Sequence, residues 1–142
     1  MHHPIPSISA TAQAIACGER RAADVLEICI ARIAATDARV NAFTSTCFEA
    51  AREQAQQIDA KRARNEPLGP LAGVPFAVKN LFDVAGEPTL AGSKVNQSHA
   101  PAVADAVLVQ RLKAAGAVLV GSLNMDEYAY GFVTENSHYG PT

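Results

Sequence analysis

Lys79 is the residue of this sequence whose type and position best suit proton transfer or nucleophilic attack. It follows residues 74–78, an almost wholly apolar run, and it precedes Asn80 and Leu81. Apolar surroundings disfavour the charged form of a lysine, and the neutral amine can act as a base or as a nucleophile. The alternative is that the lysine stem lies along the end of a strand while the ammonium stays in water. This run of residues by itself supports both interpretations.

The spacing of histidines and cysteines predicts no metal site. The three cysteines are widely separated and form no C-x-x-C pair, and the four histidines show no ligand spacing beyond one adjacent pair near the N-terminus. We interpret the cysteines as small buried hydrophobic residues of a reducing compartment, not as disulfide partners or zinc ligands. The residues concerned are Cys17, Cys29, Cys47, His2, His3, His99 and His138.

The composition is that of a globular domain. The chain has 142 residues, of which 49% are hydrophobic and 18% are charged, and its formal net charge is −2. Such a chain can bury a core, and it carries no basic surface suited to nucleic acid. No stretch approaches the ~18 consecutive apolar residues of a membrane span, and the first residues lack the layout of a secretory signal. We expect a cytoplasmic protein that binds neither nucleic acid nor membrane.

Residues 1–66 are predicted to form an N-terminal helical layer. A short alanine-rich helix over 7–16 is followed by Gly18, and residues 22–35 carry the 3.6-residue apolar period of an amphipathic helix. The Thr-x-x-Glu order at 46–49 matches a capping box and is expected to open a third helix. Each helix has one apolar face, so this layer must lie against another part of the protein.

Residues 67–142 are predicted to be the start of an α/β core. Apolar runs at 74–78 and 117–121 indicate buried strands, and the apolar period of 103–115 indicates a helix that crosses between them. A strand, a crossover helix and a second strand form a right-handed unit in which the two strands are parallel.

The carboxyl ends of parallel strands are where ligands bind in open α/β sheets. Lys79 and the segment 122–130 both lie at these ends, which favours a functional interpretation of Lys79. Within that segment, Asn124 is expected to cap one or two helical turns over 124–131.

Four blocks of this sequence, in this order and spacing, are together similar to the amidase signature family. They are G-P-L-A-G-V-P-F-A-V-K-N from position 69, T-L-A-G-S-K from 89, A-D-A-V-L-V-Q-R-L-K-A-A-G-A-V-L-V-G-S-L-N-M-D-E-Y-A-Y-G from 104, and T-E-N-S-H-Y-G-P-T from 134. The resemblance covers nearly the whole chain. It implies the α/β amidase signature fold, in which a helical layer precedes a mixed, mainly parallel sheet.

Two branches of this family remain open as alternatives. V-K-N-L-F-D from position 78 and the ending Y-G-F-V-T-E-N-S-H-Y-G-P-T resemble most the branch that hydrolyses 1-carboxybiuret in cyanuric acid degradation. The alternative is the glutamine-hydrolysing subunit of a glutamine-dependent amidotransferase. Most family members have Asp-Asn after the lysine, so Asn80-Leu81 favours the first branch. Either branch implies hydrolysis of a small amide or urea-like C–N bond that releases ammonia, with no cofactor.

The resemblance implies a Ser–cis-Ser–Lys triad, and Lys79 matches its lysine. The family carries both serines in a Gly-Gly-Ser-Ser-Gly-Gly block, which this sequence does not contain. The available hydroxyls of Ser93, Ser122 and Ser137 lie in no glycine-rich turn, and we assign none of them as the nucleophile. Ser93 is expected to shape the loop over the active site.

Tyr128, Ala129 and Tyr130 match the family segment that approaches the substrate. The resemblance therefore implies that these residues line the substrate pocket. The alternative is that the two tyrosines are core aromatics on a helix.

Two interpretations of the whole chain follow. In the first, it is the N-terminal part of a longer amidase, truncated before the serines and inactive alone; in the second, it is a non-catalytic interaction module. Two parallel strands with one crossover helix leave open sheet edges, which favours the first interpretation. For a full-length enzyme the resemblance also implies a small amide substrate, a homo-oligomer and a small helical partner subunit.

Overall fold

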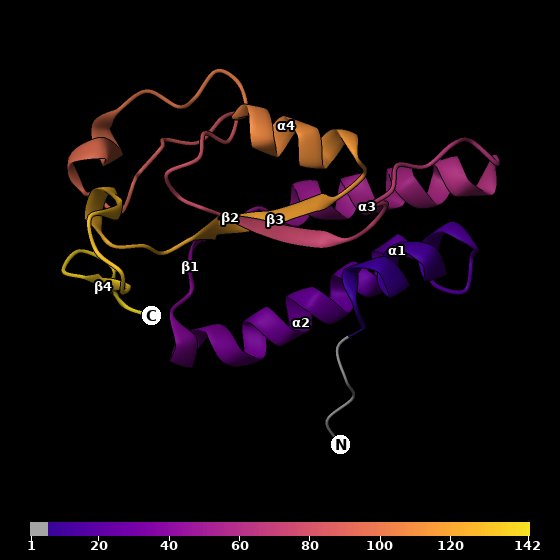
Figure 1. Cartoon of the computed structure of the whole chain (residues 1–142), viewed down its shortest axis with the longest axis horizontal. Helices are drawn as coiled ribbons and strands as arrows, with labels where there is room; N and C mark the ends of the chain where they lie inside the picture. Colours follow the sequence, from indigo (N-terminus) through magenta and orange to yellow (C-terminus); the bar gives the residue numbers. More distant parts are fainter. Residues whose placement is uncertain (1–5) are drawn as a thin grey trace.

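The helices and strands are arranged as three layers, with a sheet between two sets of helices (Figure 1). The structure is a computed structural model, and it describes residues 6–142. The helices are α1 (Ile8–Ala16), α2 (Ala22–Val40), α3 (Phe48–Ala63) and α4 (Val107–Ala114), with 3₁₀ turns η1 (Val95–Ser98) and η2 (Glu127–Ala129). The strands are β1 (Phe43–Thr46), β2 (Pro75–Lys79), β3 (Val118–Leu123), β4 (Glu135–Asn136) and β5 (Gly140–Pro141).

The central sheet has the strand order β1-β3-β2. β2 and β3 are parallel, which confirms the pairing expected from the two apolar runs. β1 pairs with β3 in the antiparallel direction, so the N-terminal region contributes a strand as well as helices. The register places Lys79 opposite Leu123, the last residue of β3.

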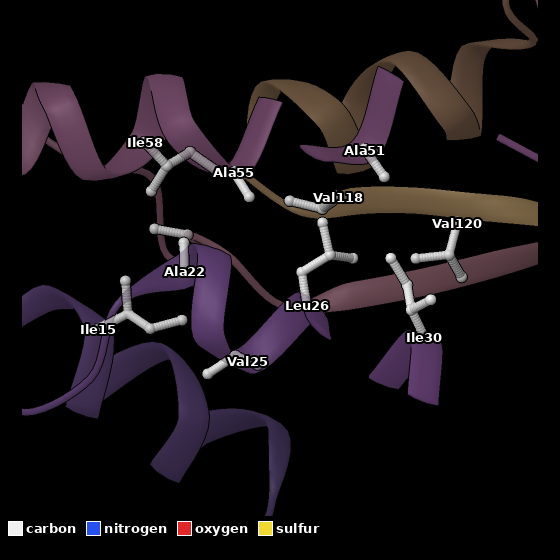
Figure 2. Packing of buried hydrophobic residues seen from close by; sticks show 11 residues of the cluster. Ile15, Ala22, Val25, Leu26, Ile30, Ala51, Ala55, Ile58, Val118 and Val120 are labelled. Atoms are coloured by element: carbon white, nitrogen blue, oxygen red, sulfur yellow. The ribbon is translucent and has the colours of Figure 1, made fainter. Parts of the chain in front are cut away.

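Both faces of β3 are buried, because its side chains alternate between two cores. Val118 and Val120 pack against α1, α2 and α3, in a cluster that includes Ile15 and Leu26 (Figure 2). Leu119 points to the opposite face and packs with Val109 of α4 and with Val78 of β2. Two-sided burial is what the continuous apolar run at 117–121 predicted.

The N-terminus of α2 is capped by a residue from a different helix. The cap position of α2, Arg21, makes no side-chain capping bond. Instead the carboxylate of Asp59 in α3 accepts hydrogen bonds from the N–H groups of Ala22 at 2.8 Å and Ala23 at 3.1 Å. The helix continues to Val40, beyond the predicted end at residue 35, and it stops where Asn41 adopts a left-handed conformation (φ 54°).

The predicted capping box at 46–49 is wrong. α3 begins at Phe48 with Cys47 at the cap position and no side-chain capping bond. Thr46 is the last residue of β1 and lies opposite Gly121 of β3. The pairing of β1 with β3 uses the backbone that a Thr46 cap would need, so tertiary pairing overrides the local motif.

The predicted helix at 103–115 is shorter in the structure, where α4 begins at Val107. Val103, assigned to the apolar face, is fully exposed at 102%, and Val107 and Leu108 are also exposed. Asp105 occupies the segment before the helix, where its carboxylate accepts from Ala85 N–H at 2.9 Å and binds Lys113 Nζ at 2.6 Å. These contacts hold the residues before Val107 in a loop.

The cysteines are free thiols, but their burial differs from the prediction. Cys29 and Cys47 are half-buried, whereas Cys17 is exposed at the end of α1. Burial raises the pKa of the Cys29 thiol and of the Cys47 thiol, which keeps both protonated at neutral pH. None of the described helices has the length and hydropathy that crossing a membrane requires.

Candidate active site

Lys79 stands at the carboxyl end of β2, as the sequence predicted. The preceding residue, Val78, is buried in the core, and the chain turns immediately afterwards, with Phe82 N–H donating to Lys79 O at 3.0 Å. The loops that follow β2 and β3 gather at this end of the sheet together with the β4–β5 hairpin (Figure 1). The Lys79 side chain is exposed, so residues 6–142 do not provide the apolar enclosure that the sequence suggested for its ammonium.

Asn80, the residue after Lys79, is buried and holds this turn in place. Its backbone N–H donates to Leu123 O at 3.0 Å. Its side-chain Oδ1 accepts from Gly92 N–H at 2.9 Å, and its Nδ2 donates to Thr44 Oγ1 at 3.1 Å. In the sequence, Asn80 is distinguished only as a departure from a family pattern. Its structural role depends on partners distant in the chain.

The segment with Tyr128, Ala129 and Tyr130 is a single strained turn, not the predicted helical start. Tyr128 and Ala129 have φ values of 55° and 58°. Among residues that carry a Cβ, few apart from Asn and Asp adopt this left-handed backbone region. Asn124 does not cap a helix; its Nδ2 donates to Gly140 O at 2.9 Å.

The two tyrosines of this turn are not core aromatics. Tyr128 is 48% exposed and Tyr130 is 92% exposed. Hydrogen bonds nevertheless hold both the backbone and the side chain of Tyr128. Its N–H donates to Ala91 O at 2.9 Å, and its hydroxyl donates to Asn96 Oδ1 at 3.1 Å. The structure therefore places an ordered aromatic turn on the same end of the sheet as Lys79.

The serines differ in burial, and none faces Lys79 as a nucleophile in the described contacts. Ser93 is fully buried, and its Oγ accepts from Val95 N–H at 3.2 Å, which agrees with a role in shaping the loop. Ser122 is buried within β3, and Ser137 is exposed in the β4–β5 hairpin.

Glu127 is the charged group beside the tyrosine turn. Hydrogen bonds from the Ser93 hydroxyl and from His138, together with the charge of His138, hold the pKa of the Glu127 carboxyl below its usual value. The His138 Nε2 and Glu127 Oε1 atoms are 3.1 Å apart. Glu127 is therefore an anion near neutral pH, and it contacts the β4–β5 hairpin through His138. No group of three or more His, Cys, Asp or Glu within residues 6–142 is arranged to hold a metal ion.

A pocket of about 780 Å³ lies at the opposite end of β2 from Lys79. It is lined by Val74 and Pro75 at the amino end of that strand and by side chains of α1 and α2. Because it is remote from the carboxyl edge, where Lys79, Asn80 and the tyrosine turn meet, we assign the candidate active site to the carboxyl edge.

Comparison with known proteins identifies the family of this chain. The family model described as Amidase matches residues 24–142, which include the whole central sheet, Lys79 and the tyrosine turn. This chain belongs to the amidase family.

The curated relatives of this amidase chain include two kinds of subunit. It is 64% identical, over 92% of its length, to AtzE, a 1-carboxybiuret hydrolase subunit from Pseudomonas sp. (strain ADP). It is 51% identical, over 90% of its length, to a glutamyl-tRNA(Gln) amidotransferase subunit from Streptomyces coelicolor. The chain spans 28% and 26% of the lengths of these two relatives, respectively.

Solved structures show the same fold. One, from a vestigial protein complex that bears on the origin of an s-triazine catabolic enzyme, superposes with a TM-score of 0.91 at 63% identity. A bacterial aryl acylamidase of the amidase signature family superposes with a TM-score of 0.90 at 27% identity. The two superpositions include 93% and 96% of the residues of this chain, respectively. In each case they include 29% of the solved chain. The mixed α/β fold is therefore that of amidase signature enzymes.

Proposed function

We propose that this chain forms the lysine-bearing part of an amidase signature hydrolase that acts on 1-carboxybiuret. The observation that carries the proposal is the joint placement of Lys79 and the tyrosine turn at one end of an amidase-type sheet. The greater identity to the Pseudomonas 1-carboxybiuret hydrolase subunit, 64% against 51% for the Streptomyces amidotransferase subunit, favours this substrate over glutamine.

In the proposed reaction, Lys79 is the terminal base. A serine hydroxyl attacks the carbonyl carbon of the substrate, and its proton passes through a second serine to the neutral Lys79 amine. The tetrahedral intermediate collapses to an acyl-enzyme as the proton returns to the leaving nitrogen, which departs as ammonia or an amine. Water then hydrolyses the acyl-enzyme by the same proton path. Backbone N–H donors that stabilise the oxyanion commonly contribute ~10²–10³ in rate.

The two serines of this mechanism are not among the 142 residues, which contain no Gly-Gly-Ser-Ser block. They must come from polypeptide outside this sequence. The exposed Lys79 side chain is consistent with that requirement, because a covering segment would both supply the hydroxyls and remove the ammonium from water. Tyr128, Ala129 and Tyr130 are proposed to line the substrate pocket. The homo-oligomer and the small helical partner subunit remain proposals for the complete enzyme.

The substrate is tested with the protein produced from its own gene. Its intact mass is compared with the 14.9 kDa of this chain, and ammonia release is measured with 1-carboxybiuret and with glutamine. Release from 1-carboxybiuret alone supports the proposal, and release from glutamine alone supports the amidotransferase alternative. No release from either substrate supports the non-catalytic interaction module.

The role of Lys79 is tested in a chimaera in which this chain replaces the matching segment of the Pseudomonas relative. We expect the chimaera to hydrolyse 1-carboxybiuret and Lys79→Ala to abolish turnover. Lys94→Ala is the matched control, because Lys94 is an exposed lysine in the same region and makes no ion pair among the described residues. Equal activity in the Lys79→Ala and Lys94→Ala variants would remove Lys79 from the mechanism.

A further inference from the structure

Gly92 is held between two buried carboxamides. Its N–H donates to Asn80 Oδ1 at 2.9 Å, and its carbonyl oxygen accepts from Asn136 Nδ2 at 2.7 Å. Asn80 is 3% exposed and Asn136 is 5% exposed. Gly92 has a φ of +71°, and a Cβ there would lie 2.9 to 3.0 Å from Asp126 O, Met125 O and Asn136 Nδ2. Only glycine allows the backbone to approach Asn136 this closely.

Asn136 uses all of its hydrogen-bonding groups. Besides the bond to Gly92, its Nδ2 donates to Met125 O at 2.7 Å. Its Oδ1 accepts from the N–H groups of His138 at 2.7 Å and Tyr139 at 3.0 Å. One side chain thus joins three segments, which are the turn at Gly92, the chain after β3, and the β4–β5 hairpin. A carboxamide suits this junction because it offers two donors and an acceptor at one point.

The junction connects Lys79 to the tyrosine turn. Asn80, adjacent to Lys79, accepts from Ala91 N–H at 2.9 Å through its backbone carbonyl. Ala91 in turn accepts from Tyr128 N–H at 2.9 Å. The turn at 91–92 therefore lies between Lys79 and Tyr128, and Asn136 fastens it to the carbonyl of Met125, three residues before Tyr128.

We propose that Asn136 is a positioning residue, which sets the placement of Tyr128 and Tyr130 relative to Lys79 without touching the substrate. The proposal rests on the function proposed above in so far as Lys79 and these tyrosines belong to one active site. A buried carboxamide that satisfies four hydrogen bonds resists displacement, because any movement would leave buried polar groups unpaired.

The tyrosines provide a built-in probe of this junction. The chain has three tyrosines and no tryptophan, and all three tyrosines lie at 128, 130 and 139. The tyrosine band of the near-ultraviolet circular dichroism spectrum lies at longer wavelength than the bands of the five phenylalanines, so it reports on this region alone. In a Tyr139→Phe background the same band reports on Tyr128 and Tyr130. Far-ultraviolet circular dichroism of the same samples reports on the whole fold.

Asn136→Asp is the informative variant, because it preserves size and acceptor atoms but removes both N–H donors. At neutral pH it places a carboxylate against the carbonyl oxygens of Gly92 and Met125. We expect the tyrosine band to fall at least about twofold, since the local junction opens while the helices and central sheet persist. On acidification toward pH ~5 the introduced carboxyl regains an O–H donor, and we expect the band to recover.

Asn124→Asp is the matched control. Asn124 is equally buried, but its Nδ2 donates to Gly140 O and Thr142 Oγ1 and makes no contact with Gly92. The proposal predicts an unchanged band for Tyr128 and Tyr130 in this control. An unchanged band in Asn136→Asp, or an equal loss in both variants, would overturn the proposal.

Hydrogen exchange of the unmodified chain tests the same junction without a substitution, in case Asn136→Asp does not fold. We expect the N–H groups of Gly92 and Tyr128 to be protected at least about 100-fold over a free loop. Free-loop exchange rates at both positions in the folded chain would also overturn the proposal.

In the turnover-competent protein, Asn136→Asp is expected to lower kcat/KM about 10–100-fold, because misplaced substrate contacts weaken transition-state stabilisation. Absence of turnover in the unsubstituted protein would count against the proposed function only. The spectroscopic and exchange results decide the positioning role in either case.

Discussion

The backbone N–H of Tyr128 donates a hydrogen bond to the carbonyl oxygen of Ala91 at 2.9 Å. Both residues have left-handed φ values, 49° for Ala91 and 55° for Tyr128, and Ala129 follows at 58°. For a residue with a Cβ atom, this backbone conformation costs about 1–2 kcal/mol of conformational energy. Such strain is kept where surrounding contacts enforce it, and it is concentrated at functional sites. Ala91 is hydrogen-bonded to Asn80, the residue next to Lys79, so this strain is consistent with the candidate active site.

The isolated 142-residue chain is expected to release no ammonia from 1-carboxybiuret or glutamine. Lys79 has no serine in a glycine-rich turn to receive a proton from, and its side chain is exposed. The measurement is a coupled ammonia assay on the purified chain. Turnover that disappears in Lys79→Ala would contradict this prediction.

Gly92→Ala is expected to destabilise the chain by about 2–4 kcal/mol, through left-handed strain and overpacking. The added Cβ would lie within 3.0 Å of two backbone carbonyl oxygens and the Asn136 carboxamide. Gly86→Ala is the control, because Gly86 also has a positive φ of +86° but no atom within 4 Å of its Cβ position. Urea unfolding should show the smaller loss for Gly86→Ala. Equal losses would mean that the close approach at Gly92 contributes nothing.

Asp59→Ala is expected to lower the free energy of unfolding by about 1–2 kcal/mol, because it leaves two N–H groups of α2 without their capping acceptor. The N–H groups are those of Ala22 and Ala23. Asp59→Asn retains one acceptor oxygen, so its free energy of unfolding should lie between those of the unsubstituted chain and Asp59→Ala. Glu53→Ala, an exposed acidic residue of the same helix, serves as the control, and a loss as large as that of Asp59→Ala would refute the capping role.

The pair formed by Asp105 and Lys113 is expected to stabilise the chain in a pH-dependent manner. Burial raises the pKa of the Asp105 carboxyl, but hydrogen bonds from Lys113 and from Ala85 N–H, with the Lys113 charge, outweigh it and leave the pKa lowered. A carboxyl whose folded-state pKa is lowered contributes stability above its unfolded pKa, about 3.9, and loses it as pH falls through the folded-state value.

Asp105→Asn should therefore be less stable than the unsubstituted chain by about 1–2 kcal/mol at pH 7. The difference should shrink as the pH falls below ~4, because the unfolded chain then protonates Asp105 more readily than the folded chain does. Urea midpoints measured between pH 3 and pH 7 test this, with Glu53→Gln as the exposed control. A difference that stays constant down to the lowest pH would show that the ionised carboxylate is not the source of the stability.

Several features of this protein were determined by short stretches of sequence. The apolar runs predicted β2 and β3 and their parallel pairing, and they placed Lys79 at a carboxyl end. The alanine-rich stretch before Gly18 predicted α1, and the apolar periodicity of residues 22–35 predicted α2. These signals succeed because burial of a continuous or periodic apolar surface depends mainly on neighbouring residues.

Other features were decided only by the tertiary structure. Thr46 pairs with Gly121 as part of β1 and therefore does not cap α3. The hydrogen bond from Ala85 N–H to Asp105 keeps the start of the predicted crossover helix in a loop. The junction at Gly92 joins residues 12 and 44 positions away in the chain. A carboxamide in the sequence indicates neither its burial nor its partners, because hydrogen bonds between distant segments exist only once the strands have placed those segments together.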